Sequence, residues 1–167
     1  MQISVVTEWR DVYDRAVGLL ARRPWAEAEL RARLLSGARG GSPDAVAAAL
    51  ARCRELGYLD DDAFARALAR GRLDGAGQGP WRVQRELESR GVSASLARQA
   101  LDEALGARDP VDLAAAALVR RYGAGGCTDR KQLKKRYDFL LRRGFSHEQA
   151  WAALVREGSG DGEEPTS

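Results

Sequence analysis

The feature that most constrains the fold of this chain is an internal repeat. Residues 90–105 (RGVSASLARQALDEAL) and residues 143–157 (RGFSHEQAWAALVRE) both read Arg-Gly-apolar-Ser followed by Ala-x-x-Ala-Leu, and their glycines, Gly91 and Gly144, lie 53 residues apart. A Pro-Trp pair recurs in the same way at Pro24 and Pro80, 56 residues apart. A period of about 50 residues that holds three helices is typical of a small α-solenoid.

Apolar residues recur at helical spacing along almost the whole chain, and the pattern predicts nine helices. Ala, Leu, Arg and Glu are frequent while Val and Ile are sparse, which favours helix over sheet. We expect the first helix over residues 12–22 and the second to begin at Pro24, since proline suits a first helical turn. The predicted fold is all-α, with three tandem three-helix repeats over residues 12–59, 60–106 and 107–157, an N-terminal extension over 1–11, and a disordered acidic tail over 158–167.

Several helix starts carry capping signals. Ser42 precedes Pro43, Asp109 precedes Pro110, and Ser146 stands three residues before Gln149 as in a capping box. Such side chains accept hydrogen bonds from the first free backbone N–H groups of a helix. The sequence therefore predicts helices that begin directly after these three residues.

Three consecutive aspartates, Asp60, Asp61 and Asp62, follow Gly57 in the stretch GYLDDDAFA. Successive residues on a helix point about 100° apart, so three adjacent carboxylates do not converge on one ion. A calcium loop needs ligands at alternate positions with a glycine and a distal glutamate. We therefore expect Asp60 or Asp61 to cap the helix that buries Phe64, with the remaining acids facing its positive end.

Positive charge is concentrated in the last third of the folded chain. The net charge is +3, but the last eleven residues hold four acids and no base, so residues 1–156 carry +7. Between Arg120 and Arg143, nine bases stand against Asp129 and Asp138. Helical spacing puts Lys131, Lys134 and Lys135 on one face. A second group of bases comprises Arg70, Arg72, Arg82, Arg85 and Arg90. One dominant sign of charge predicts an acidic partner, foremost nucleic acid.

Other functional classes find little support. Cys53 and Cys127 are far apart and form no Cys-x-x-Cys pair, so we expect no zinc site and no disulfide. His147 is the single histidine and has no Cys or Asp neighbour at dyad spacing, and GAGQG follows no strand and lacks the lysine of a phosphate loop. No signal peptide and no membrane span are expected, which predicts a soluble, cytoplasmic protein. We also expect the protein to bind no cofactor.

Four stretches in order resemble the RecX family, the regulators of the RecA recombinase. They are LLARRPWAEAELRARL (19–34), ELGYLDDDAFARALARGR (55–72), GPWRVQRELESRGV (79–92) and FLLRRGFSHEQAWAAL (139–154). Ala26 departs from the pattern, since the family often has a serine there that can cap the second helix. The positions that carry the resemblance are Gly57, Tyr58, Leu59, Asp60, Asp61, Phe64, Gly79, Glu86, Leu87, Gly91, Gly144 and Phe145.

The resemblance implies a curved, elongated, right-handed-type array of three repeats without an active site. It implies a monomer that binds RecA filaments on single-stranded DNA, inhibits their ATPase and strand exchange in DNA repair and the SOS response, and in some members binds DNA directly, double-stranded DNA included. Arg72, Arg90 and Arg143 are carried over from the motifs as contact residues. Charge clustering adds six further candidates: Arg82, Arg85, Lys131, Lys134, Lys135 and Arg142.

Two other functions stay open at this point. A stand-alone module that masks DNA would bind it through phosphate contacts, although the sequence shows no aromatic platform interleaved with the bases. A metal-dependent nuclease would need the three aspartates to act together, which the helix geometry disfavours.

Overall fold

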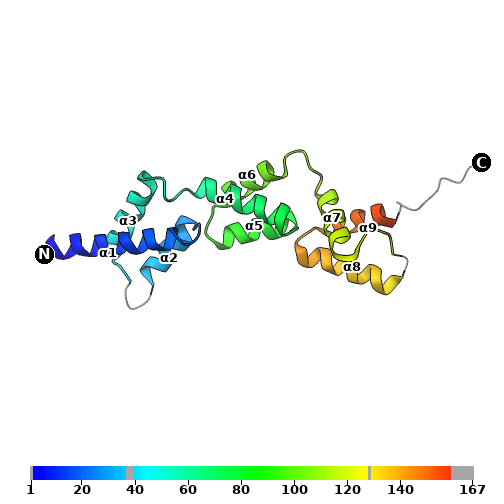
Figure 1. Ribbon diagram of the computed structural model, residues 1–167, viewed down its shortest axis with the longest axis horizontal. Helices are drawn as coiled ribbons and strands as arrows, with labels where there is room; N and C mark the ends of the chain where they lie inside the picture. Colours follow the sequence, from blue (N-terminus) through cyan, green and yellow to red (C-terminus); the bar gives the residue numbers. More distant parts are fainter. Residues whose placement is uncertain (1, 37–39, 128, 159–167) are drawn as a thin grey trace, which may run out of the picture. The chain divides into compact units, whose positions relative to one another are not determined.

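The computed structural model describes residues 2–36, 40–127 and 129–158, with side chains from Glu8 onward (Figure 1). Within these ranges the chain forms nine α-helices, one π-helical turn and no strand. The elements are α1 (Gln2–Leu20), α2 (Glu27–Leu35), α3 (Pro43–Glu55), α4 (Asp61–Arg70), η1 (Gly71–Gly75), α5 (Pro80–Ser89), α6 (Ala94–Leu105), α7 (Pro110–Tyr122), α8 (Arg130–Arg143) and α9 (His147–Gly158). The prediction of an all-α fold is confirmed.

The helices belong to two compact units. Unit 1 comprises the chain up to Ala67 together with Leu87–Ala97, and unit 2 comprises Leu68–Glu86 together with the chain from Arg98. Helices α4, α5 and α6 therefore contribute residues to both units. Of the predicted disordered tail, residues 159–167 lie outside the described part of the chain.

The first helix is longer than predicted. It begins at Gln2 rather than Val12, so most of the expected N-terminal extension is helical. Trp9 stacks on Tyr13 with ring centroids 5.6 Å apart, and the carboxylate of Glu8 accepts a hydrogen bond of 2.6 Å from the backbone N–H of Ser42. Ile3, Val5 and Val6 obscured the helical pattern because β-branched residues are weak helix formers. The contacts of Glu8 and Trp9, in the turn that follows these residues, favour the helix nonetheless.

The second helix begins later than predicted, at Glu27 instead of Pro24. The indole of Trp25 donates a hydrogen bond of 3.1 Å to the carbonyl of Leu19, and the guanidinium of Arg23 lies 3.5 Å from the centre of the Trp25 ring. These contacts hold the Pro-Trp pair as an extended link between α1 and α2. The proline therefore precedes the helix and does not form its first turn.

The predicted caps are present. Ser42 Oγ accepts from the N–H of Ala45 at 3.3 Å, and the carboxylate of Asp109 accepts from that of Val111 at 2.9 Å. Ser146 and Gln149 form a reciprocal capping box with hydrogen bonds of 3.1 and 2.9 Å. Each of these contacts is local in sequence, which is why the sequence predicted it.

The repeated sequence pattern is repeated in the burial of the third helix of each trio. The buried residues are Val46, Ala49 and Leu50 in α3, Ala97, Ala100 and Leu101 in α6, and Ala150, Ala153 and Leu154 in α9. Spacing of i, i+3 and i+4 puts each set on one face of its helix, and small residues let that face approach its neighbours closely. The internal repeat of the sequence is thus a repeat of packing.

Two glycines permit close backbone approaches. Within unit 1, Gly91 has φ +87°, and a Cβ atom there would overlap the Cβ of Ala28 on α2. Within unit 2, a Cβ atom on Gly79 would overlap the backbone of Gly144, and the N–H of Gly79 donates to the carbonyl of Arg143 at 2.8 Å. These positions carry the family resemblance because a side chain would separate the packed segments.

Each unit has its own core. In unit 1, α1, α2 and α3 pack around Val12, Leu30, Leu34 and Leu50. Cys53 lies in the same core, and burial raises the pKa of its thiol. In unit 2, α7, α8 and α9 pack around a second cluster, whose largest members are Leu118, Leu140, Phe145 and Leu154. These cores hold the surface residues described below on rigid helices.

Candidate nucleic-acid and partner interface

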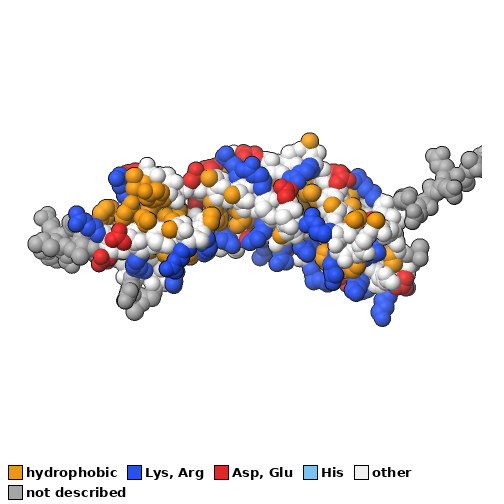
Figure 2. Space-filling view, in the orientation of Figure 1, with side chains coloured by type: hydrophobic (Ala, Val, Ile, Leu, Met, Phe, Trp, Pro, Cys, Tyr) orange, Lys and Arg blue, Asp and Glu red, His pale blue; other side chains and the backbone are white. Residues whose placement is uncertain are grey.

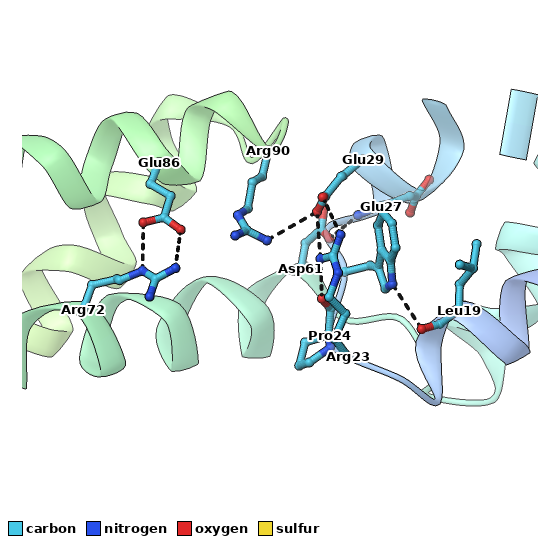
Figure 3. Close-up of polar contacts among 10 residues, drawn as sticks. Leu19, Arg23, Pro24, Glu27, Glu29, Asp61, Arg72, Glu86 and Arg90 are labelled. Carbon is cyan, nitrogen blue, oxygen red and sulfur yellow. Dashed lines mark hydrogen bonds and ion pairs between the residues drawn. The ribbon is translucent and has the colours of Figure 1, made fainter. Parts of the chain in front are cut away.

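The three aspartates at the start of α4 have three different partners. Asp60 caps α4 by accepting from the N–H of Ala63 at 2.9 Å, and Asp62 pairs with Arg66 one turn later. Asp61 points elsewhere and accepts from the backbone N–H of Glu27 at 2.7 Å (Figure 3). Among the described residues, no group of three His, Cys, Asp or Glu side chains is arranged to hold a metal ion.

Asp61 therefore caps α2 rather than its own helix. The N-cap residue of α2 is Ala26, which has no side chain able to accept a hydrogen bond, although its ψ of 147° is the extended geometry of a cap. A carboxylate that comes from 34 residues further along the chain supplies the missing acceptor. Desolvation raises the pKa of Asp61, and the hydrogen bond from Glu27 partly opposes that rise. The Ala26 departure from the family pattern is compensated in this way.

The three arginines carried over from the motifs are partly buried and have partners. Arg72 forms a bidentate pair with Glu86, with N···O distances of 2.8 and 2.7 Å (Figure 3). In unit 1, Arg90 lies 3.6 Å from Glu29 and over the ring of Phe64. Arg143 donates to the carbonyl of Ala76 and lies over the ring of Phe139. These side chains stabilise the packing of their own units.

The six candidates chosen by charge clustering are all exposed: Arg82, Arg85, Lys131, Lys134, Lys135 and Arg142. Arg82 donates to the carbonyl of Arg142 at 2.9 Å, which joins the start of α5 to the end of α8. Figure 2 shows Lys and Arg side chains at the lower right of the view, where α8 lies in Figure 1. Unit 2 thus presents cations from α5 and α8 to solvent.

One base of α8 does not belong to this surface. Arg136 is only 8% exposed and forms an ion pair of 3.0 Å with Glu157 of α9. Its guanidinium also donates to the carbonyl of Gly125 and lies over the ring of Tyr122. Burial raises the pKa of Glu157, and the nearby Arg136 opposes that rise. The count of nine bases made from the sequence included a residue that the fold turns inward.

A groove between α8 and α9 was not predicted. It has a volume of about 760 Å³ and an apolar lining of Leu133, Tyr137, Trp151 and Leu154. Arg130, Lys131 and Lys134 of α8 line it as well. Trp151 is 63% exposed, because the buried stripe of α9 runs through Ala150, Ala153 and Leu154 and leaves Trp151 outside. The position of Trp151 off that stripe is visible in the sequence and indicates its exposure.

A second tryptophan, Trp81 on α5, is 61% exposed, and the guanidinium of Arg85 lies 5.0 Å from its ring centre. Exposed tryptophans therefore lie beside bases in unit 2, although the sequence showed no aromatic platform interleaved with the bases. Tyr58, which belongs to the family motif, is 54% exposed and lines a smaller hollow of unit 1 with Arg22 and Arg23. Within the described ranges, no helix combines the length and apolarity that crossing a bilayer requires.

Known proteins are similar to this chain in sequence and in fold. Residues 60–101 match the model of the second three-helix domain of RecX, and residues 108–154 match that of the third. The regulatory protein RecX of Xanthomonas axonopodis pv. citri (strain 306) is 41% identical over 144 residues, which cover 83% of each chain. That of Chromohalobacter salexigens is 40% identical over 142 residues, covering 85% of this chain and 90% of the relative.

Two crystal structures have a similar fold. RecX from Lactobacillus salivarius superimposes with a TM-score of 0.73 at 17% identity, covering 91% of this chain and 97% of that one. A second structure, of a regulatory protein RecX, gives a TM-score of 0.72 at 22% identity and covers 93% of this chain and 75% of that one. Both likenesses concern the fold.

Proposed function

This chain belongs to the RecX family of regulatory proteins, and from this premise we propose that it binds RecA filaments on single-stranded DNA and inhibits their ATPase and strand-exchange activity. It acts by binding and carries out no reaction of its own. The observation that carries the proposal is the exposed face of α8, where Lys131, Lys134 and Lys135 stand together. Acidic surfaces of filament protomers and DNA phosphates are the ligands that such a face attracts.

The contact residues divide into two classes in this proposal. The exposed cations of α5 and α8 meet the partner directly, and their net charge makes binding sensitive to salt. The motif residues Arg72 and Arg143 stabilise unit 2, which presents these cations, and Arg90 stabilises unit 1, since each contacts a residue of its own unit. Replacing Arg72 should therefore weaken binding through loss of packing, and replacing its partner Glu86 should have a similar effect.

The deciding experiment is a titration of the protein into RecA that hydrolyses ATP on single-stranded DNA. Inhibition well below one molecule per RecA protomer supports action on the filament. Inhibition only when the protein saturates the DNA would refute the proposal and would favour a protein that masks DNA.

A pair of charge reversals tests the surface. Lys134→Glu with Lys135→Glu should raise the concentration needed for inhibition and flatten its salt dependence, because fewer counterions are released on binding. Arg10→Glu with Arg33→Glu is the matched control, since it changes the net charge equally at exposed residues of α1 and α2. Equal losses in both variants would refute the assignment of binding to α8.

A further inference from the structure

We propose that the groove between α8 and α9 binds single-stranded nucleic acid by stacking an unpaired base on Trp151, with the cations of α8 holding the adjacent phosphates. The inference deepens the proposed function by assigning one surface to the DNA strand. The observation behind it is a large aromatic face and a row of cations on the same groove.

The exposure of Trp151 is not required by the fold. The buried face of α9 is complete without it, since Ala150, Ala153 and Leu154 fill the contact with the rest of the core. Leu133 and Tyr137 continue the apolar surface beside the indole, so the groove is an apolar floor and not a single projecting side chain. An exposed apolar surface of this kind marks an interaction site.

The charges around the groove favour an anionic ligand. Arg130, Lys131 and Lys134 line it, and Asp129 is the only acid among the described lining residues. The carboxylate of Asp129 is engaged in capping α8, where it accepts from the N–H of Gln132 at 3.0 Å. Lys134 pairs with Asp138 at 2.9 Å but its side chain remains 77% exposed, so it is able to exchange that partner for a phosphate.

The polar groups of the groove favour nucleic acid over an acidic peptide. The hydroxyl of Tyr137 is 2.7 Å from Nδ1 of His147 and is therefore occupied within the protein. Among its described lining residues, the groove offers a ligand the π face of Trp151 and the positive charge of Arg130, Lys131 and Lys134. This is the chemistry of binding that tolerates any base sequence, in which bases stack on aromatic rings and cations follow the backbone. Stacking needs an unpaired base, so single strands are preferred over duplex.

The test compares two oligonucleotides with three variants in the absence of RecA. A 15-mer of thymidylate offers bases and phosphates, whereas an abasic strand of equal length offers phosphates alone. Trp151→Ala should lower affinity for the thymidylate strand by about 10- to 100-fold and leave affinity for the abasic strand unchanged. Trp151→Phe should keep most of the affinity, because a phenyl ring still stacks. Trp81→Ala removes an equally exposed tryptophan from α5, outside the groove, and should change the affinity for the thymidylate strand less than Trp151→Ala does.

Three outcomes would overturn the inference. The first is a Trp151→Ala variant that binds both strands as the wild type does. The second is a variant that loses affinity for both strands equally. The third is unchanged strand binding with loss of RecA inhibition, which would assign the groove to a protein partner. Because strand binding is measured without RecA, failure here is separate from failure of the proposed function, which the ATPase titration reports. Unchanged far-ultraviolet circular dichroism and thermal midpoints of the variants exclude misfolding as the cause of any loss.

Discussion

The capping of α2 by Asp61 gives the sharpest test of how unit 1 is held together. The carboxylate accepts one hydrogen bond of 2.7 Å from the N–H of Glu27, and Ala26 at the cap position offers no acceptor of its own. Removing a cap costs about 0.5–2 kcal/mol. We expect Asp61→Ala to lower the free energy of unfolding by about that amount, or the thermal midpoint by about 2–8 °C.

Two further variants isolate the hydrogen bond from the charge. Asp61→Asn keeps an oxygen that accepts from Glu27, and asparagine caps as well as aspartate without the cost of a desolvated charge, so at pH 7 it should be at least as stable as the wild type. In the Asp61→Ala background, Ala26→Ser should restore part of the loss, since residue 26 already has cap geometry. Asp62→Ala is the matched control, because it removes a neighbouring, exposed carboxylate that pairs with the half-buried Arg66.

The pH dependence follows from the raised pKa of Asp61, which desolvation causes. A carboxyl whose pKa is higher in the folded than in the unfolded state binds protons preferentially in the folded state. The contribution of this carboxyl group to the free energy of unfolding is therefore fully present below its pKa in the unfolded state. It is lost as the pH rises through its pKa in the folded state. The wild type should lose stability relative to Asp61→Asn as pH rises through that window, measured by urea unfolding. Equal stability losses in Asp61→Ala and Asp62→Ala would refute the capping argument.

Three other substitutions probe the packing of unit 2. Gly79→Ala should destabilise it strongly, because the added methyl group would overlap the backbone at the end of α8, and thermal melts should show a clear fall in the midpoint. Arg72→Ala should cost about 1 kcal/mol by loss of the half-exposed bidentate pair, and a double-mutant cycle with Glu86→Ala should show that the two losses are not additive. Arg136→Met should cost about 3–5 kcal/mol at pH 7, since it leaves Glu157 buried without its cation. That variant should regain stability as pH falls and Glu157 is protonated, and unfolding curves that do not change with pH would contradict the buried pair.

The candidate site was predictable in part. The exposed positions of Lys131, Lys134 and Lys135 followed from helical spacing, since three residues at i, i+3 and i+4 share a face. Arg136 was grouped with them because composition does not distinguish a solvated cation from one that meets a buried carboxylate 21 residues later. The groove at Trp151 was not predictable for a related reason. Its cations, Lys131 and Lys134, come from α8, and only the fold brings them beside Trp151 of α9.

The sequence by itself determined the all-α fold, the repeat and the caps at Ser42, Asp109 and Ser146, because helical periodicity and capping depend on residues within a few positions of one another. Only the tertiary structure decided the contacts between segments distant in the chain. In the tertiary structure α1 begins at Gln2, Asp61 caps α2, and Arg136 is buried against Glu157. Each of these outcomes depends on which segments the fold brings together, and a local pattern holds no information about a partner 20 or more residues away.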